Sequence, residues 1–274
     1  MAIGSNNRYE LASVIGRGSQ GNIVSGIDTT TNQPVAIKIF HTKTQEGMFG
    51  FSNESLAMNK IKSKSKYLCE IMDCFQPSED VGVIIMKRYQ SDLFDYFFGT
   101  QTRELATKKQ MLKQVCLGVS DLHRNGIAHL DIKPENILVD AEENIVICDF
   151  GCSFYDRQLK NSKQNNIFGL KGRGTRTYAA PEVNELESFD PLKADIYSLG
   201  VLLHVTITGF FPNVGDLRFA EKAVDGECLS LLRMMLDINP DTRATIDQVL
   251  SHPYISVHKK RKSLNKRLPR FLRR

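Results

Sequence analysis

The densest group of chemically active side chains in the sequence lies between His129 and Asn136. Within this segment, Asp131 supplies a carboxylate, Lys133 an ammonium group and Asn136 an amide, and a second acid, Asp149, follows thirteen residues after Asn136. Amide and carboxylate oxygens suit Mg²⁺, which keeps several waters and shares its coordination sphere with substrate phosphates. The two segments therefore indicate metal-assisted chemistry on a phosphate group, with Asn136 and Asp149 as candidate ligands.

A predicted β-hairpin connects the two candidate ligands. The short apolar runs 137–139 and 144–148 flank an Asp-Ala-Glu-Glu sequence that is typical of a turn. Because Asn136 precedes the first run and Asp149 follows the second, antiparallel pairing would bring them to the same end of the hairpin. An Asp-Phe-Gly tripeptide alone often occurs by chance. Its occurrence thirteen residues after the end of the segment 129–136 is a specific signal.

A glycine motif stands near the start of the chain, where Gly16-Arg-Gly-Ser-Gln-Gly21 matches G-x-G-x-x-G. A dinucleotide-binding fold would need a helix after this motif and an acid about 20 residues on. Residues 22–28 instead have the pattern of a strand, and position 36 is alanine. Glycine lacks a Cβ, so backbone amides in a loop between two strands could approach phosphate oxygens closely. The motif alone leaves a simple glycine-rich hairpin turn as the alternative.

Lys38 ends the apolar sequence Val35-Ala-Ile-Lys, seventeen residues after Gly21. A lysine in an apolar strand is costly to bury unless its ammonium group is paired. Its aliphatic stem could also lead the charge back to the surface, as in most strand lysines. The glycine loop before it and the acid-bearing segment after it favour a paired lysine within a site.

The elements that would position these residues change character along the chain. Residues 9–40 are rich in β-branched residues and predict an antiparallel meander, and residues 81–86 predict another strand. Apolar residues at helical spacing predict a helix over 104–124, and a polar helix is expected over 53–61. Further helices are expected over 194–208, 229–236 and 246–250. The stretch 199–211 is too short to span a membrane and indicates a buried helix. A strand-rich lobe beside a helical lobe makes an α+β protein with a cleft, where ligands usually bind.

The composition, 41% hydrophobic and 24% charged residues, is ordinary for a soluble globular protein of 274 residues. No stretch approaches the roughly 18 apolar residues of a membrane span, and residues 1–7 do not resemble a secretory signal. The six cysteines form no C-x-x-C pair. We therefore expect reduced cysteines in an intracellular, cytoplasmic protein.

The net charge of +5 comes from the end of the chain, because residues 258–274 contain nine Lys and Arg and no acid, and the remainder has a net charge of −4. We therefore expect no specific nucleic acid partner. The tail, 256–274, is consistent with a solvated end, a nuclear address, an anionic membrane contact, a site for a regulator, or a pseudosubstrate around Ser263.

The motifs together resemble those of the eukaryotic protein kinase family. They run in this order: the glycine loop, Val-Ala-Ile-Lys38, His129-Leu-Asp-Ile-Lys-Pro-Glu-Asn136, Asp149-Phe-Gly, Gly174-Thr-Arg-Thr-Tyr, Ala180-Pro-Glu182 and Asp195-Ile-Tyr-Ser-Leu-Gly. The resemblance covers residues 9–255 and implies a two-lobed fold with a small antiparallel β-rich lobe and a larger helical lobe. It divides the chain into an N-lobe over about 9–86, a hinge at 87–91 and a C-lobe over 92–255.

The resemblance also implies catalytic and metal-binding roles. Asp131 would be the catalytic base, Lys133 would contact the γ-phosphate of ATP, and Lys38 would hold the α- and β-phosphates. The partner of Lys38 would be Glu54, with Glu46 as the alternative. Asn136 and Asp149 would bind Mg²⁺. Three further residues would be structural: Glu182 and Arg243 as a buried ion pair, and Asp195 as a support for the catalytic loop.

The residues implied for ATP binding surround the glycine loop and the hinge. They are Ile15, Gly16, Arg17, Gly18, Ser19, Gln20, Gly21, Ile23, Ala36, Lys38, Met86, Lys87, Tyr89, Asp92, Glu135 and Leu138. Ile23, Ala36 and Leu138 would enclose adenine, and Asp92 would meet the ribose. Met86 would be the gatekeeper, with the backbone of Lys87 and Tyr89 at the adenine edge.

Within the family, the sequence resembles the kinases that act on serine or threonine. Lys133 stands two residues after Asp131, and Thr175 lies in Gly-Thr-x-x-Tyr, as in that branch. The hydroxyl of Thr175 would support both Asp131 and Lys133. Within the branch, the layout is similar to calcium/calmodulin-dependent kinases. Two alternatives are a pseudokinase scaffold, which would usually lack residues of the Lys38, Asp131 or Asp149 type, and a small-molecule kinase, which would lack the Gly-Thr-x-x-Tyr segment.

Three positions depart from the family pattern. Gln20 replaces the usual aromatic residue at the tip of the glycine loop, which predicts looser cover of the phosphates. Val205 replaces a glutamate found in arginine-directed kinases. Leu130 replaces the arginine beside the catalytic aspartate, so we expect activity without phosphorylation of the activation segment, the stretch between Asp149 and Glu182. The basic residues of this segment could instead pair with a phosphate on Ser162 or Thr177; they are Arg157, Lys160, Lys163, Lys171, Arg173 and Arg176.

Overall fold

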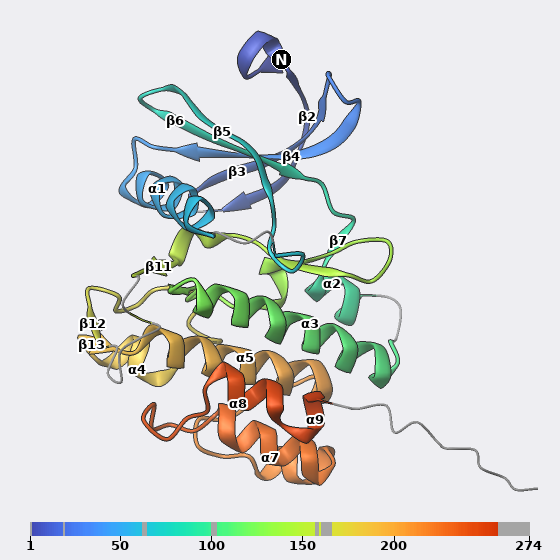
Figure 1. The fold of residues 1–274 in the computed structure, drawn as a ribbon, viewed down its shortest axis with the longest axis vertical. Coiled ribbons are helices and arrows are strands. Elements are labelled where there is room, and N and C mark those ends of the chain that lie inside the picture. Colours follow the sequence, from blue (N-terminus) through green and yellow to red (C-terminus); the bar gives the residue numbers. More distant parts are fainter. Residues whose placement is uncertain are drawn as a thin grey trace, which may run out of the picture.

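The computed structural model describes residues 2–18, 20–61, 65–99, 103–156, 159 and 166–256. The predictions for Ser19, Ser162 and the tail beyond residue 256 therefore lie outside the described residues. A β-sheet forms one end of the molecule and a group of helices forms the other, with helix α1 beside the sheet (Figure 1). This arrangement confirms the α+β, two-lobed fold predicted from the sequence.

The N-terminal sheet has six strands in the order β1-β2-β3-β4-β6-β5, all antiparallel. They are β1 (Ala2–Ile3), β2 (Tyr9–Gly18), β3 (Gly21–Asp28), β4 (Gln33–His41), β5 (Ile71–Ser78) and β6 (Val81–Lys87). The predicted meander is therefore confirmed, with β5 as an additional strand. A Cβ at Gly21 would lie 1.9 Å from the carbonyl oxygen of Ile39, so only glycine allows β3 to approach β4 this closely.

Helix α1 (Gln45–Lys60) begins eight residues before the predicted start at residue 53. The hydroxyl of Thr44 caps it by accepting a hydrogen bond from the Gly47 N–H at 3.0 Å. Both Gly47 and Gly50 lie inside the helix, although glycine is a poor helix former. A Cβ at Gly47 would lie 2.1 Å from the His41 carbonyl oxygen, and one at Gly50 would lie 2.5 Å from Oε1 of Gln20. These glycines serve close packing rather than a turn.

The C-terminal lobe is mostly helical, as predicted (Figure 1). Its helices are α2 (Leu93–Phe98), α3 (Leu105–Arg124), α4 (Pro181–Glu185), α5 (Pro191–Thr208), α6 (Arg218–Ala223), α7 (Gly226–Met235), α8 (Ile246–Ser251) and α9 (Pro253–Ser256). The short strands are β7 (Ser91–Asp92), β8 (Ile127–Ala128), β9 (Ile137–Val139), β10 (Ile145–Ile147), β11 (Phe154–Tyr155), β12 (Ile167–Phe168) and β13 (Ser188–Phe189). Within the described part of the chain, we find no helix with the length and apolar character needed to cross a membrane.

Helix α5 forms the centre of this lobe, and most of its residues are buried, including Leu199, Val201 and Leu202. The helix ends at Thr208, as predicted for the helix over 194–208, and does not continue to the end of the apolar run 199–211. Gly209 follows in the left-handed conformation with φ 77°, which ends the helix and turns the chain outward. Phe210 is consequently 62% exposed rather than part of the buried helix.

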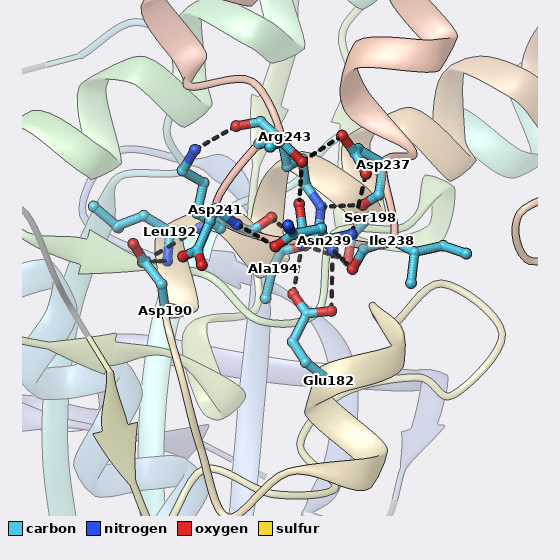
Figure 2. A network of polar contacts seen from close by, with 12 residues as sticks. Glu182, Asp190, Leu192, Ala194, Ser198, Asp237, Ile238, Asn239, Asp241 and Arg243 are labelled. Atoms are coloured by element: carbon cyan, nitrogen blue, oxygen red, sulfur yellow. Dashed lines mark hydrogen bonds and ion pairs between the residues drawn. The ribbon is translucent and has the colours of Figure 1, made fainter.

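A buried ion pair between Glu182 and Arg243 ties α4 to the loop before α8 (Figure 2). Arg243 donates two hydrogen bonds to the Glu182 carboxylate, one of them at 3.0 Å from Nη2. Its remaining donors reach backbone carbonyl oxygens of Asp237 at 2.8 Å, Lys193 at 2.8 Å and Ile238 at 3.3 Å. A fully buried guanidinium with this many acceptors has a structural role.

Candidate active site

A cleft of about 510 Å³ lies between the glycine loop and the segments that carry Asp131 and Asp149. It is lined by Gly16, Arg17, Gly18, Gln20, Gly21, Ile23, Lys38, Asp131, Lys133, Glu135, Asn136, Asp149, Cys152, Gly174 and Thr175. The fold therefore brings together the predicted catalytic and metal-binding residues except Glu54, which lies just behind the wall.

Lys38 lies between two carboxylates. Its Nζ is 2.7 Å from Oε2 of Glu54 and 2.8 Å from Oδ1 of Asp149. Glu54, and not the alternative Glu46, is thus the contact of Lys38 on α1. Burial alone would lower the pKa of Lys38, but the two carboxylates raise it above its ordinary value. The ammonium group therefore stays charged at one wall of the cleft.

Asp149 has an unusual backbone conformation, with φ 61° in the left-handed region. It precedes the 3₁₀ turn η3 (Phe150–Cys152), whose Gly151 N–H donates to Asp149 Oδ1 at 3.3 Å. Burial opposes ionisation of Asp149, but the charge and hydrogen bond of Lys38 outweigh it and hold the pKa of this carboxyl below its usual value. Because its side chain is still 38% exposed, Asp149 presents a charged carboxylate to the cleft.

Three donors hold the carboxylate of Asp131. The Thr175 N–H donates to Oδ1 at 2.8 Å, Asn136 Nδ2 donates to Oδ2 at 2.9 Å, and Lys133 Nζ lies 3.0 Å from Oδ2. The sequence predicted that the Thr175 hydroxyl supports both Asp131 and Lys133. The hydroxyl does accept from Lys133 at 2.7 Å, but the contact with Asp131 comes from the backbone of Thr175.

Gly174 allows the segment around Thr175 to approach Asp131. Its φ is +77°, and a Cβ there would lie 2.0 Å from the carbonyl oxygen of Leu130. Leu130 itself has φ 62°, which is unfavourable for a branched residue. Asp195 accepts hydrogen bonds from the N–H groups of both His129 and Leu130 at 2.8 Å and so holds this strained turn in place. The geometry agrees with a supporting role for Asp195.

Asn136 and Asp149 form a donor set that fits Mg²⁺. Asn136 lies in the 3₁₀ turn η2 (Pro134–Asn136), and its Nδ2 donates to the backbone oxygen of Asp131 at 2.8 Å and to Asp131 Oδ2 at 2.9 Å. These bonds use the amide nitrogen and leave the amide oxygen available. An amide oxygen and an ionised carboxylate on one cleft are hard ligands of the kind that Mg²⁺ binds.

The residues predicted for adenine lie around one apolar cluster. Ala36 and Met86 belong to it, and Ile23, Tyr89 and Leu138 pack against it. Predicted residues outside it are Ile15, which is 46% exposed, Lys87, whose Nζ lies 5.4 Å from the Tyr89 ring centre, and Asp92. The carboxylate of Asp92 caps α2 by accepting from the Asp95 N–H at 2.9 Å, and burial raises its pKa.

The structure shows further contacts of α1, made by Phe49, Gly50 and Asn53, that the sequence did not predict. Asn53 Nδ2 donates to the carbonyl oxygen of Gly151 at 3.0 Å. The guanidinium of Arg173 lies 4.6 Å from the ring centre of Phe49. Gln20 extends into a notch between Gly50 and Gly151, where a Cβ on either glycine would lie within 2.5 Å of Gln20 Oε1. Gln20 and Gly151 lie in motifs, but no motif marks Phe49, Asn53 or Arg173, because their contacts depend on where α1 packs.

A β-rich lobe joined to a helical lobe is the architecture of protein kinases, and so is a cleft that sets a lysine–glutamate pair opposite an aspartate-centred loop. The sequence matches the family model "Protein kinase domain" over residues 9–255, so the chain belongs to this family.

Individual relatives are serine/threonine and related kinases of very different organisms. The chain is 28% identical to the probable serine/threonine-protein kinase fhkC of Dictyostelium discoideum, over 94% of this chain and 46% of that protein. It is 27% identical to NUAK family SNF1-like kinase 1 of Homo sapiens, over 91% and 39%, respectively. It is also 27% identical to CBL-interacting protein kinase 2 of Oryza sativa subsp. japonica, over 96% and 60%. The chain thus spans about half the length of these curated relatives.

Proposed function

We propose that this protein is a serine/threonine protein kinase that transfers the γ-phosphoryl group of ATP to a hydroxyl group of a protein substrate. The observation that carries the proposal is the Asp131 carboxylate, which three donors fix on the same cleft as Lys38 and Asp149. Family membership supports the reaction class.

Asp131 would act on the substrate hydroxyl. The hydroxyl oxygen forms a bond to the γ-phosphorus while the bond between that phosphorus and the β–γ bridging oxygen breaks, and ADP leaves. The hydroxyl proton passes to the Asp131 carboxylate. The contacts with Thr175 and Asn136 limit rotation of the carboxylate, so that it meets the hydroxyl in one orientation.

Two lysines would supply positive charge along the triphosphate. Lys38 would bind the α- and β-phosphates, and Lys133, which lies against Asp131 and Thr175, would bind the γ-phosphate. Charges that are already in place stabilise the transferring group without reorganisation. Mg²⁺, held by Asn136 and Asp149, would neutralise part of the remaining phosphate charge.

The choice of serine or threonine rests on Lys133 and Thr175, whose side chains are in contact at 2.7 Å beside Asp131. The relatives named as serine/threonine kinases support the same choice. A pseudokinase scaffold would bind ATP without transfer. A small-molecule kinase would phosphorylate a metabolite rather than a peptide.

The test is phosphate transfer by the purified protein from labelled ATP to an array of peptides that carry serine, threonine or tyrosine. We expect labelling of serine and threonine peptides. Asp131→Asn should lower kcat by about 10²–10⁴-fold because the base is lost, yet it should keep ATP binding, measured by calorimetry. Asp149→Asn should instead weaken the use of Mg·ATP.

The matched control is Asp80→Asn, because Asp80 is 49% exposed and pairs with Lys43 away from the cleft. This variant should retain wild-type turnover. If the wild-type protein binds ATP but labels no peptide, the protein is a pseudokinase scaffold and not an enzyme. If it labels only small molecules, it is a small-molecule kinase.

A further inference from the structure

We propose that Arg173 is a positioning residue that holds α1 and the Asp-Phe-Gly turn in the arrangement needed for phosphate transfer, without a phosphate group on the activation segment. The inference rests on the proposed function for its kinetic consequences. Its structural consequence, the order of α1 and of the turn, can be measured on a protein that carries out no reaction.

Arg173 joins the start of the activation segment to a later part of it. Its Nη1 donates to the carbonyl oxygens of Cys152 at 3.3 Å and Ser153 at 3.1 Å, directly after the turn that begins at Asp149. The chain continues from Arg173 into Gly174 and Thr175, and the Thr175 N–H holds Asp131 at 2.8 Å. The side chain of Arg173 therefore links the residues that follow Asp149 to the segment 173–175, whose backbone fixes the Asp131 carboxylate.

The same guanidinium contacts α1. It lies 4.6 Å from the ring centre of Phe49, in the geometry of a cation–π interaction. Phe49 and Asn53 are four residues apart on α1 and so lie on the same side of the helix. Asn53 binds the Gly151 carbonyl oxygen at 3.0 Å, and the next residue, Glu54, binds Lys38 at 2.7 Å. Movement of Phe49 away from Arg173 would therefore draw Glu54 away from Lys38.

The charge of Arg173 is accommodated without an acid. Among the described residues, no carboxylate forms an ion pair with it, and its partners are two carbonyl dipoles and an aromatic face. Arginine suits this role because its planar group donates in fixed directions and is more weakly hydrated than an ammonium group. The guanidinium of Arg173 is thus already held by groups of the protein and requires no phosphate for its order.

Among the described residues of this segment, few other cations could bind a phosphate. Leu130, beside Asp131, is 5% exposed and supplies no second guanidinium. Lys171 pairs with Glu187 at 2.6 Å. Of the cations described in this segment, only Arg176 is exposed and without an ion pair or hydrogen bond to another described residue. Arg173 therefore takes the part that an added phosphate and its arginine would otherwise have.

The test compares variants of both partners in protein that phosphatase has freed of phosphate. Phe49→Leu removes the ring but keeps an apolar side chain, and Phe49→Tyr keeps the ring. Arg173→Lys keeps the charge but loses the planar donor group. We expect Phe49→Leu and Arg173→Lys each to lower kcat/KM for ATP by about tenfold, mainly through a higher KM, while Phe49→Tyr stays within about twofold of the wild type.

The double variant Phe49→Leu/Arg173→Lys should be no worse than about the more impaired single variant, because both changes break one interaction. Hydrogen exchange should accelerate in residues 46–56 and 150–155 in each impaired variant. Met48→Ala is the matched control on α1, since Met48 is 45% exposed and Phe49 is 42% exposed. Lys171→Ala is the control in the segment, and both controls should behave like the wild type.

Three results would overturn the inference. One is that Phe49→Leu and Arg173→Lys leave kcat/KM and hydrogen exchange unchanged. Another is that the two effects multiply fully in the double variant. The third is that phosphatase treatment alone inactivates the wild type. If the wild type has no kinase activity even before treatment, the proposed function fails, and hydrogen exchange alone decides the role of Arg173. All variants are compared by thermal unfolding, so loss of the fold is recognised separately.

Discussion

Two buried acid–base groups in this molecule use similar residues for different ends. In the helical lobe, Arg243 is 0% exposed at its side chain and binds the Glu182 carboxylate and three backbone carbonyl oxygens (Figure 2). In the cleft, the single ammonium of Lys38 lies between the carboxylates of Glu54 and Asp149. Arg243 therefore pairs with one carboxylate, whereas Lys38 pairs with two.

The difference lies in what remains for a ligand. Around Arg243, donors and acceptors are matched within the protein, so a ligand would have to displace an existing hydrogen bond. Around Lys38, the additional carboxylate belongs to Asp149, which is 38% exposed on the cleft. A buried pair with an unmatched, accessible charge marks a binding site, whereas a buried pair with matched groups stabilises the fold.

The largest effect should follow from removal of Arg243. Arg243→Met leaves the Glu182 carboxylate buried without a partner, and breaking such a pair costs about 3–5 kcal/mol of unfolding free energy. Urea denaturation followed by circular dichroism measures it. Arg218→Met is the control, because Arg218 is 84% exposed at its side chain and pairs with Asp216 on the surface. An equal urea midpoint for Arg243→Met and the wild type would contradict a structural role for the matched pair.

Removal of Lys38 should have the opposite balance of effects. We expect Lys38→Met to lower kcat/KM by about 10²–10³-fold, because a preorganised charge on the phosphates is lost. Its urea midpoint should fall less than that of Arg243→Met. Burial already raises the pKa of Glu54, so that this acid can take up a proton when the lysine is absent, and Asp149 reaches water. If Lys38→Met is as unstable as Arg243→Met but fully active, Lys38 has a structural role and not a role in binding the phosphates.

The sequence predicted the charged residues of both groups because short motifs carry them. Asp131, Lys133 and Asn136 lie within six residues, and the hairpin β9–β10 places Asp149 next to them. The contacts made by Asn53 and Arg173 were not predictable in this way. Asn53 binds a residue 98 positions later in the chain, and the position of α1 determines that contact. The start of α1 was itself misread, because its glycines follow from packing against other elements and not from local preference.

The pH dependence of stability should separate the accessible acid from the rest of the fold. The pKa of Asp149 is lowered in the folded protein, since Lys38 outweighs the effect of burial. The stabilisation is therefore fully present above the unfolded value near 3.9 and is lost as the pH falls through the lower folded value. We expect the difference in urea midpoint between the wild type and Asp149→Asn to be constant from pH 5 to pH 7 and to shrink below about pH 4. A difference that grows towards acid pH would show that Lys38 does not dominate the environment of Asp149.

The smallest effect concerns Gly50, which lies on α1 one turn before Glu54. Glycine within a helix costs up to about 1 kcal/mol relative to alanine, so Gly50→Ala should stabilise the helix. The added Cβ would lie 2.5 Å from Gln20 Oε1 and would force the amide of Gln20 out of its notch. Because Gln20 lines the cleft at the glycine loop, the KM for ATP should rise by a few-fold.

The Gly50 prediction has its own control in the residue that the new methyl group would displace. In Gln20→Ala the notch is already vacated, so adding Gly50→Ala should keep the gain in stability without a further rise in KM. Steady-state kinetics and thermal unfolding of the two single variants and the double variant measure both quantities. If Gly50→Ala raises KM equally with and without Gln20, the glycine acts on the Lys38–Glu54 pair directly. The group formed by Lys38, Glu54 and Asp149 would then tolerate less change in its surroundings than the group around Arg243. There, Lys193 and Ile238 contribute only backbone carbonyl oxygens.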